Sequence, residues 1–173
     1  MSEQEKSKTK KRPARAVARS SARLGAVQAL YQMELSGRGL NDVLAEYNSR
    51  RLGETFDDGE CGDADVPFLK DILEGVLREQ LTLDKKLNEF LSDNWKLPKL
   101  DATMRAIFRA AAFELQFKKD VPPPVTITEY VDVTKAFFER EEARFVNGVL
   151  DRYARWARAE AFKTAKSGDG QAK

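Results

Sequence analysis

Apolar residues recur every three or four positions along most of this chain, and no two stretches alternate between apolar and polar residues strongly enough to predict paired strands. One stripe consists of Val17, Leu24, Val27, Tyr31 and Leu35. A spacing of three to four residues places side chains on one face of an α-helix, so the pattern predicts amphipathic helices that bury their apolar faces against one another. We therefore expect an all-α fold, with about seven helices joined by short connections.

Turn and capping signals divide the chain into these helices. The first six expected helices begin near Pro13, Leu40, Pro67, Leu83, Asp101 and Thr126, and the apolar positions from Phe145 to Trp156 mark a last long helix. Gly37 predicts the end of the first helix, and Asp101 is a suitable N-cap for the fifth. Thr126 and Glu129 have the spacing of a capping box, although residues 125–128 could instead form a short strand. The glycines and acidic residues of 52–63 predict a break between the second and third helices.

The two ends of the chain differ in composition from its middle. Residues 1–11 are polar, basic and without apolar periodicity, so we expect a disordered basic arm. Residues 163–173 are expected to form a disordered tail, which leaves 12–162 as a single helical domain. The formal net charge of +2 hides an uneven distribution, because residues 1–23 carry +6 and residues 54–65 carry six acidic residues and no basic one.

Composition excludes several classes of function. The chain contains no histidine and a single cysteine, Cys61. Histidine-dependent hydrolases, zinc sites and internal disulfides are therefore excluded, and no metal or other cofactor is expected. There is no glycine-rich phosphate-binding motif, so we expect a protein that is not an enzyme. The absence of a long apolar run and of a signal peptide predicts a cytoplasmic protein.

A row of arginines at the start of the first helix is the strongest candidate site. Its members are Arg12, Arg15, Arg19 and Arg23. At about 100° per residue they fall within an arc of roughly 80°, away from the apolar stripe. Planar guanidinium groups bind phosphate bidentately and stack on unpaired bases. An ordinary solvated helix face is the alternative, but the row has no acidic partner four residues on and continues from the basic arm.

Three further positions are weaker candidates. Arg105 and Arg109 lie one turn apart and could face RNA, or could form an ordinary pair neutralised by Glu114 or by another helix. Phe90 lies near a helix end and could stack a base, although a core position is the simpler interpretation. Gly148, inside an apolar helix, predicts close approach by a neighbouring segment.

Several segments, taken together, resemble the NusB family of bacterial transcription antitermination factors. They are RLGAVQALYQMEL at 23–35, RAIFR at 105–109, FEL at 113–115, DVP at 120–122, ITE at 127–129 and FVNGVLD at 145–151. The resemblance covers roughly 15–158, and the last segment is its most specific part. It implies two three-helix halves that share a core, together with a role that is not enzymatic.

The resemblance also implies partners and site residues. Proteins of this family bind boxA RNA of ribosomal RNA leaders together with NusE, a small-subunit ribosomal protein, and so act on RNA polymerase with other Nus factors. The arginine-rich start of the first helix contacts RNA in the family, which fits the row above. Arg105, Arg109 and Phe90 occupy positions that the resemblance assigns to RNA.

The surface for NusE is expected to include Tyr31, Met104 and Glu141. Met104 stands where relatives commonly have an acidic residue, so one expected ion pair to the partner is missing. Relatives occur as monomers and as homodimers, and both remain open. The alternative function is a helical protein-interaction module without RNA binding; an RNA-methyltransferase role is not expected, because few residues follow the matched segments.

Overall fold

The computed structural model describes residues 11–53 and 64–167 of the chain. The described residues form seven α-helices and no strand, which confirms the all-α prediction. In chain order the helices are α1 (Ala14–Ser36), α2 (Leu40–Gly53), α3 (Val66–Phe90), α4 (Ala102–Phe117), α5 (Pro123–Phe137), α6 (Arg140–Ala157) and α7 (Ala159–Ser167), with the short 3-10 helices η1 (Asp93–Trp95) and η2 (Leu97–Lys99) between α3 and α4.

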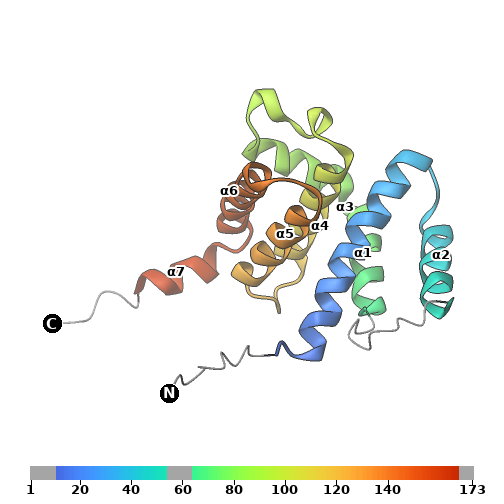
Figure 1. Ribbon diagram of the computed structural model, residues 1–173. Helices are drawn as coiled ribbons and strands as arrows, with labels where there is room; N and C mark the ends of the chain where they lie inside the picture. The colour runs from blue at the N-terminus through green and yellow to red at the C-terminus, as the bar shows by residue number, and fades with distance from the viewer. Residues whose placement is uncertain (1–10, 54–63, 168–173) are drawn as a thin grey trace, which may run out of the picture.

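The helices form two three-helix halves (Figure 1). Helices α1, α2 and α3 pack against one another in the first half, and α4, α5 and α6 do so in the second. Helix α4 lies between the halves and contacts α1 and α3 as well as α5 and α6. Seven of the eight residues before Gln116, including Phe113 and Leu115, are buried, so α4 supplies the centre of one continuous core.

Local signals fix several helix ends as the sequence predicts. Gly37 adopts the left-handed conformation, with φ 68°, and its N–H bonds to the carbonyl oxygen of Met33. The Asp101 carboxylate accepts a hydrogen bond from the Thr103 N–H at 2.8 Å and caps α4. The same arrangement at α3, which the sequence analysis did not single out, joins Asp65 to the Phe68 N–H at 3.0 Å.

Three predicted boundaries are wrong. The helices expected near Pro67 and Leu83 are a single helix, α3, because residues 79–82 contain no helix breaker. Helix α5 begins at Pro123, where proline suits the first helical turn, so Thr126 lies inside the helix and caps nothing. Helix α7 continues to Ser167, past residue 163, where we placed the start of the tail.

The close approach predicted at Gly148 is absent, and it occurs instead at a glycine that the sequence analysis passed over. A Cβ on Gly148 would meet only Nη1 of Arg152, at 3.7 Å. A Cβ on Gly75 in α3 would lie 2.1 Å from Cε2 of Phe113 in α4. Because Gly75 has no side chain, the Phe113 ring of α4 packs directly against the backbone of α3 where the two halves meet.

Some predictions concern residues that lie outside the described ranges 11–53 and 64–167. The basic arm up to residue 10, the acidic segment with Cys61 and the last six residues are among them. Within 11–53 and 64–167, no helix is both long enough and apolar enough to cross a membrane. The same ranges contain no group of three or more carboxylate, thiol or imidazole side chains placed to hold a metal ion.

Candidate nucleic-acid interface

The predicted arginine row begins at Arg12, just before α1, and continues along the first turns of α1, where the helix faces the start of α5 and the α4–α5 connection. Its four members differ sharply in exposure. Arg12 and Arg15 are exposed, and Arg19 is partly buried. Arg23 is only 2% exposed and belongs to the interior. The row therefore runs from solvent into the core and is not a uniform solvated face.

Arg23 forms a buried ion pair with Glu114 of α4. Its Nε and Nη2 donate to the two carboxylate oxygens in bonds of 2.9 Å each, and Glu114 is fully buried. Burial acts to lower the pKa of Arg23, but the hydrogen bonds and charge of Glu114 outweigh it, so this pKa is raised. Burial first, and the nearby Glu114 second, raise the pKa of Tyr130 well above its ordinary value. Arg23 thus holds α1 on α4 from a buried position.

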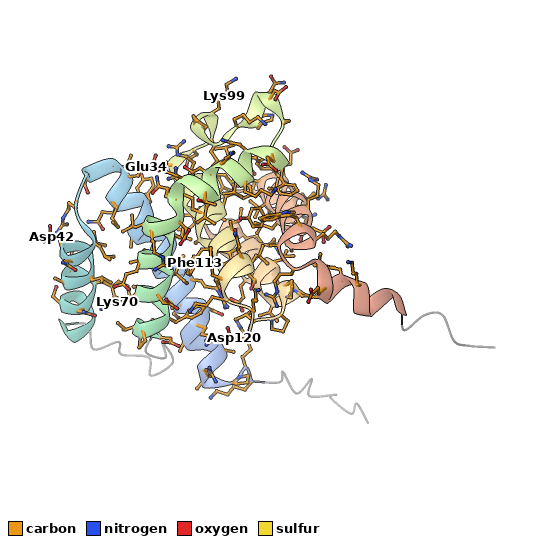
Figure 2. All side chains as sticks on the ribbon, turned by 180° about the vertical axis from the view of Figure 1, so that it is seen from behind. Glu34, Asp42, Lys70, Lys99, Phe113 and Asp120 are labelled. Carbon is orange, nitrogen blue, oxygen red and sulfur yellow. The ribbon has the colours of Figure 1, made fainter. Side chains whose placement is uncertain are left out.

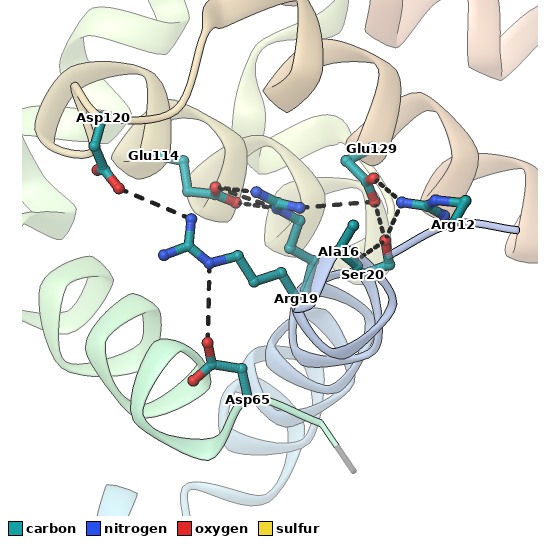
Figure 3. Close-up of polar contacts among 9 residues, drawn as sticks. Arg12, Ala16, Arg19, Ser20, Asp65, Glu114, Asp120 and Glu129 are labelled. Carbon is teal, nitrogen blue, oxygen red and sulfur yellow. Dashed lines mark hydrogen bonds and ion pairs between the residues drawn. The ribbon is translucent and has the colours of Figure 1, made fainter. Parts of the chain in front are cut away.

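The Glu129 carboxylate of α5 interacts with three side chains from the N-terminal part of the chain (Figure 3). Arg12 Nη2 and Ser20 Oγ each lie 2.7 Å from one of its oxygens, and Arg23 Nη1 lies 3.7 Å away. Its side chain is only 12% exposed. Glu129 therefore joins the exposed Arg12 to the buried pair, and it does not cap α5 as the sequence suggested.

Arg19 lies between two further carboxylates (Figure 3). Its Nε is 3.8 Å from Asp65 at the start of α3, and its Nη1 is 3.8 Å from Asp120 in the α4–α5 connection. The guanidinium also lies over the ring of Phe68, 4.6 Å from its centroid. Arg15 makes no ion pair with another described residue. The four arginines border a hollow of about 350 Å³ together with Asp120 and Glu129.

The arginines can be recognised in the sequence, but their partners cannot. Acids four residues away on the same helix would be visible there, whereas Glu114 and Glu129 come from helices that are distant in sequence. The burial of Arg23 did leave a signal. Ala26, Val27 and Leu30 follow it at the spacing of one buried helix face, so Arg23 shares the face that α1 turns toward the core.

For Arg105 and Arg109 the alternative prediction applies, because carboxylates of other helices neutralise their charges. Both bind Glu34 near the C-terminal end of α1, and Arg109 also binds Asp84 of α3 in two bonds of 2.8 Å. The hydrogen bond from Arg105 is the main cause that lowers the pKa of Glu34. Figure 2 shows Glu34 and Asp120 toward opposite ends of the molecule, so this cluster is separate from the arginine row.

Phe90 is half-buried and belongs to a three-ring cluster. Its ring centroid lies 5.7 Å from that of Tyr153 and 6.5 Å from that of Trp156, which is itself exposed. Lys86 Nζ lies over the Trp156 ring, 4.1 Å from the centroid. Phe90 therefore packs mainly as a core residue, and an edge of the cluster remains open to solvent.

The residues expected to face NusE are not equally accessible. Tyr31 is exposed on α1, and Glu141 is exposed at the start of α6. Met104 is buried, but it lines a surface hollow of about 400 Å³ together with Glu141. The walls of this hollow include Trp95 and Phe145, which make it largely apolar with an acidic edge.

The fold and this site define a class: an all-helical protein of two three-helix halves that gathers arginines and carboxylates at one end of its first helix. The NusB family model matches residues 20–155. This chain belongs to the NusB family. The family consists of transcription antitermination proteins and not of enzymes.

Individual relatives agree with this assignment. The transcription antitermination protein NusB of Sinorhizobium medicae (strain WSM419) is 48% identical over 145 residues, which are 84% of this chain and 91% of the relative. The structure of T. maritima NusB superposes with a TM-score of 0.68 at 30% identity and covers 88% of this chain and 99% of its own. A crystal structure of the antitermination factors NusB and NusE with dsRNA has a TM-score of 0.66 at 22% identity, covers 80% of this chain and 96% of its own, and supports the fold alone.

Proposed function

We propose that this protein is a transcription antitermination factor that binds boxA-type RNA together with NusE and promotes read-through during ribosomal RNA synthesis. The observation that carries the proposal is the accessible part of the arginine row, Arg12, Arg15 and Arg19, around one hollow in a chain of this family. Guanidinium groups at this spacing suit the phosphates of a short RNA strand. The protein would act in the cytoplasm, where its RNA is made.

Site residues divide by their surroundings. Arg12, Arg15 and Arg19 would contact phosphates, and the basic arm 1–11 would extend that surface. Phe90 would offer its ring cluster to a base. We assign Arg23, Arg105 and Arg109 to holding helices together, because their side chains are at most 17% exposed and are bound by carboxylates.

RNA binding is tested by fluorescence anisotropy with a labelled boxA oligonucleotide at several salt concentrations. With about three phosphates neutralised, log K is expected to fall with log salt at a slope near −2. Arg15→Ala is expected to reduce the size of that slope by about 0.7, because one phosphate contact is lost. Arg78→Ala, an exposed arginine on α3 whose neighbour is Glu79, is the matched control. Binding that does not depend on salt would refute the proposed phosphate contacts.

NusE binding is tested separately, with and without RNA. We expect NusE to dock over the apolar hollow beside Met104 and Glu141 and to tighten RNA binding. Glu141→Lys, which reverses the charge at the exposed acidic edge of the hollow, is expected to weaken NusE binding and to leave binding of RNA alone unchanged. NusE binding without any RNA affinity would instead support the alternative of a protein-interaction module.

A further inference from the structure

The end of α1 that we assign to RNA holds as many carboxylates as arginines. Arg12 is bound by Glu129, Arg19 lies between Asp65 and Asp120, and Arg23 is bound by Glu114. Only Arg15 has no such partner among the described residues. The charges of these eight described side chains therefore balance, although residues 1–23 of the sequence are strongly basic.

An RNA phosphate that reaches Arg12 or Arg19 meets a guanidinium that is already paired. Binding there is an exchange of one anion for another, so the ion pair that is lost reduces the gain from each new contact. We propose that Asp120 and Glu129 limit the RNA affinity of this protein by holding Arg19 and Arg12 in ion pairs that RNA phosphates must replace. The inference rests on the proposed function and concerns how that function is adjusted.

Asp120 is a fixed counter-charge although it is exposed. The connection that carries it is held by Arg158 at the end of α6, whose guanidinium donates to the carbonyl oxygens of Lys119 and Val121 at 2.9 and 3.2 Å. Because these bonds restrain the backbone, the Asp120 carboxylate stays near Arg19. It has no cap or core contact to lose, since its side chain is 66% exposed.

Glu129 acts on the other end of the row from a largely buried position. It shares its two oxygens between Arg12 and Ser20, so the Arg12 guanidinium is held toward α5 although the side chain stays exposed. Asp65 is a poorer subject for the test, because its carboxylate also caps α3 and any change there confounds stability with binding.

The experiment compares wild type, Asp120→Asn and Glu129→Gln with two RNAs of equal length, boxA and a scrambled sequence. Asp93→Asn is the matched control, because it removes the same charge from an aspartate that is fully exposed between α3 and α4. We expect Asp120→Asn to bind both RNAs about two- to fivefold more tightly at low salt, with a steeper salt slope, and Asp93→Asn to change little. Glu129→Gln is expected to bind RNA more tightly by a similar factor. Its thermal unfolding is measured alongside, to check that this variant is folded.

The outcomes separate this inference from the proposed function. If wild type binds RNA and Asp120→Asn binds no more tightly than Asp93→Asn, the inference is overturned and the function stands. If wild type does not bind and Asp120→Asn does, the carboxylates mask the arginines and the proposed function fails. If neither binds, both are overturned. Weaker binding by Asp120→Asn would mean that Asp120 orients Arg19 for RNA, which also contradicts the inference.

Discussion

At the scale of single residues, the same side-chain type serves two different purposes along one helix. Arg23 and Glu114 are buried together and bind each other through two hydrogen bonds, whereas Arg15 lies in solvent. A buried charge that loses its partner is costly, because the remaining ion stays desolvated. Position along α1 therefore decides whether an arginine supports the fold or is available to a ligand.

Glu114→Gln is expected to lower the free energy of unfolding by about 3–5 kcal/mol, because it leaves Arg23 charged in the interior. Urea denaturation followed by circular dichroism measures this. Arg15→Ala, on the same helix as Arg23, is expected to change stability by no more than about 0.5 kcal/mol. A loss below about 1 kcal/mol in Glu114→Gln would show that the pair is not buried as described.

Glu34 is expected to make stability depend on pH in the acid range. Its pKa is lowered in the folded protein, mainly by the hydrogen bond from Arg105, so its contribution is fully present above its ordinary value of 4.5 and is lost as the pH falls through the lowered value. Glu34→Gln should be less stable than wild type at pH 7, by about 1 kcal/mol. The gap should narrow below about pH 4.5.

Denaturation at pH 7, 5, 4 and 3 measures that gap. Glu74→Gln, an exposed glutamate on α3 whose ion-pair partner is Lys70, is the control, and its difference from wild type should be small throughout. A gap for Glu34→Gln that stays constant down to pH 3 would contradict the assignment.

At the scale of elements, the meeting of α3 and α4 depends on one glycine. Gly75→Ala places a methyl group where the Phe113 ring lies, so we expect a loss of about 1–3 kcal/mol or more. Gly148→Ala is the matched comparison, because its Cβ has room inside α6 and alanine favours a helix by about 1 kcal/mol. Thermal unfolding measures the change in stability of both variants. Destabilisation of equal size in Gly75→Ala and Gly148→Ala would contradict the packing described here.

The sequence predicts these elements better than it predicts their contacts. The Gly37 stop and the Asp101 cap depend on neighbouring residues, so both could be recognised along the chain. Gly75 gives no such signal, since its partner Phe113 is brought to it only by the fold. The boundary errors at α3 and α5 have a local origin: a long helix without a breaker resembles two short ones, and Pro123 starts α5 before Thr126 can.

At the scale of the whole molecule, the two halves share one core through α4, and Arg109 adds ion pairs to α1 and α3. We therefore expect the protein to unfold in a single cooperative transition, although its halves have separate helices. Calorimetry should give a ratio of calorimetric to van't Hoff enthalpy near one. Two resolved transitions would show that the halves are independent.

Charge is the property for which sequence and folded molecule differ most. The basic character of the first helix is plain in the sequence, but the carboxylates that compensate it are far away along the chain. Glu129 and Arg12, for example, are separated by 117 residues. A search within one helix cannot find such pairs, and the resemblance to a family indicated the RNA-facing role but not this compensation.

The attachment of the α4–α5 connection has a consequence for how such a protein can change through evolution. Arg158 binds backbone carbonyl oxygens there, and every residue type supplies a carbonyl oxygen. Side chains of the connection can therefore be replaced without releasing it, whereas position 158 is constrained. Mutation at position 120 can then raise or lower the RNA affinity in small steps, and natural selection can adjust this affinity without destabilising the fold.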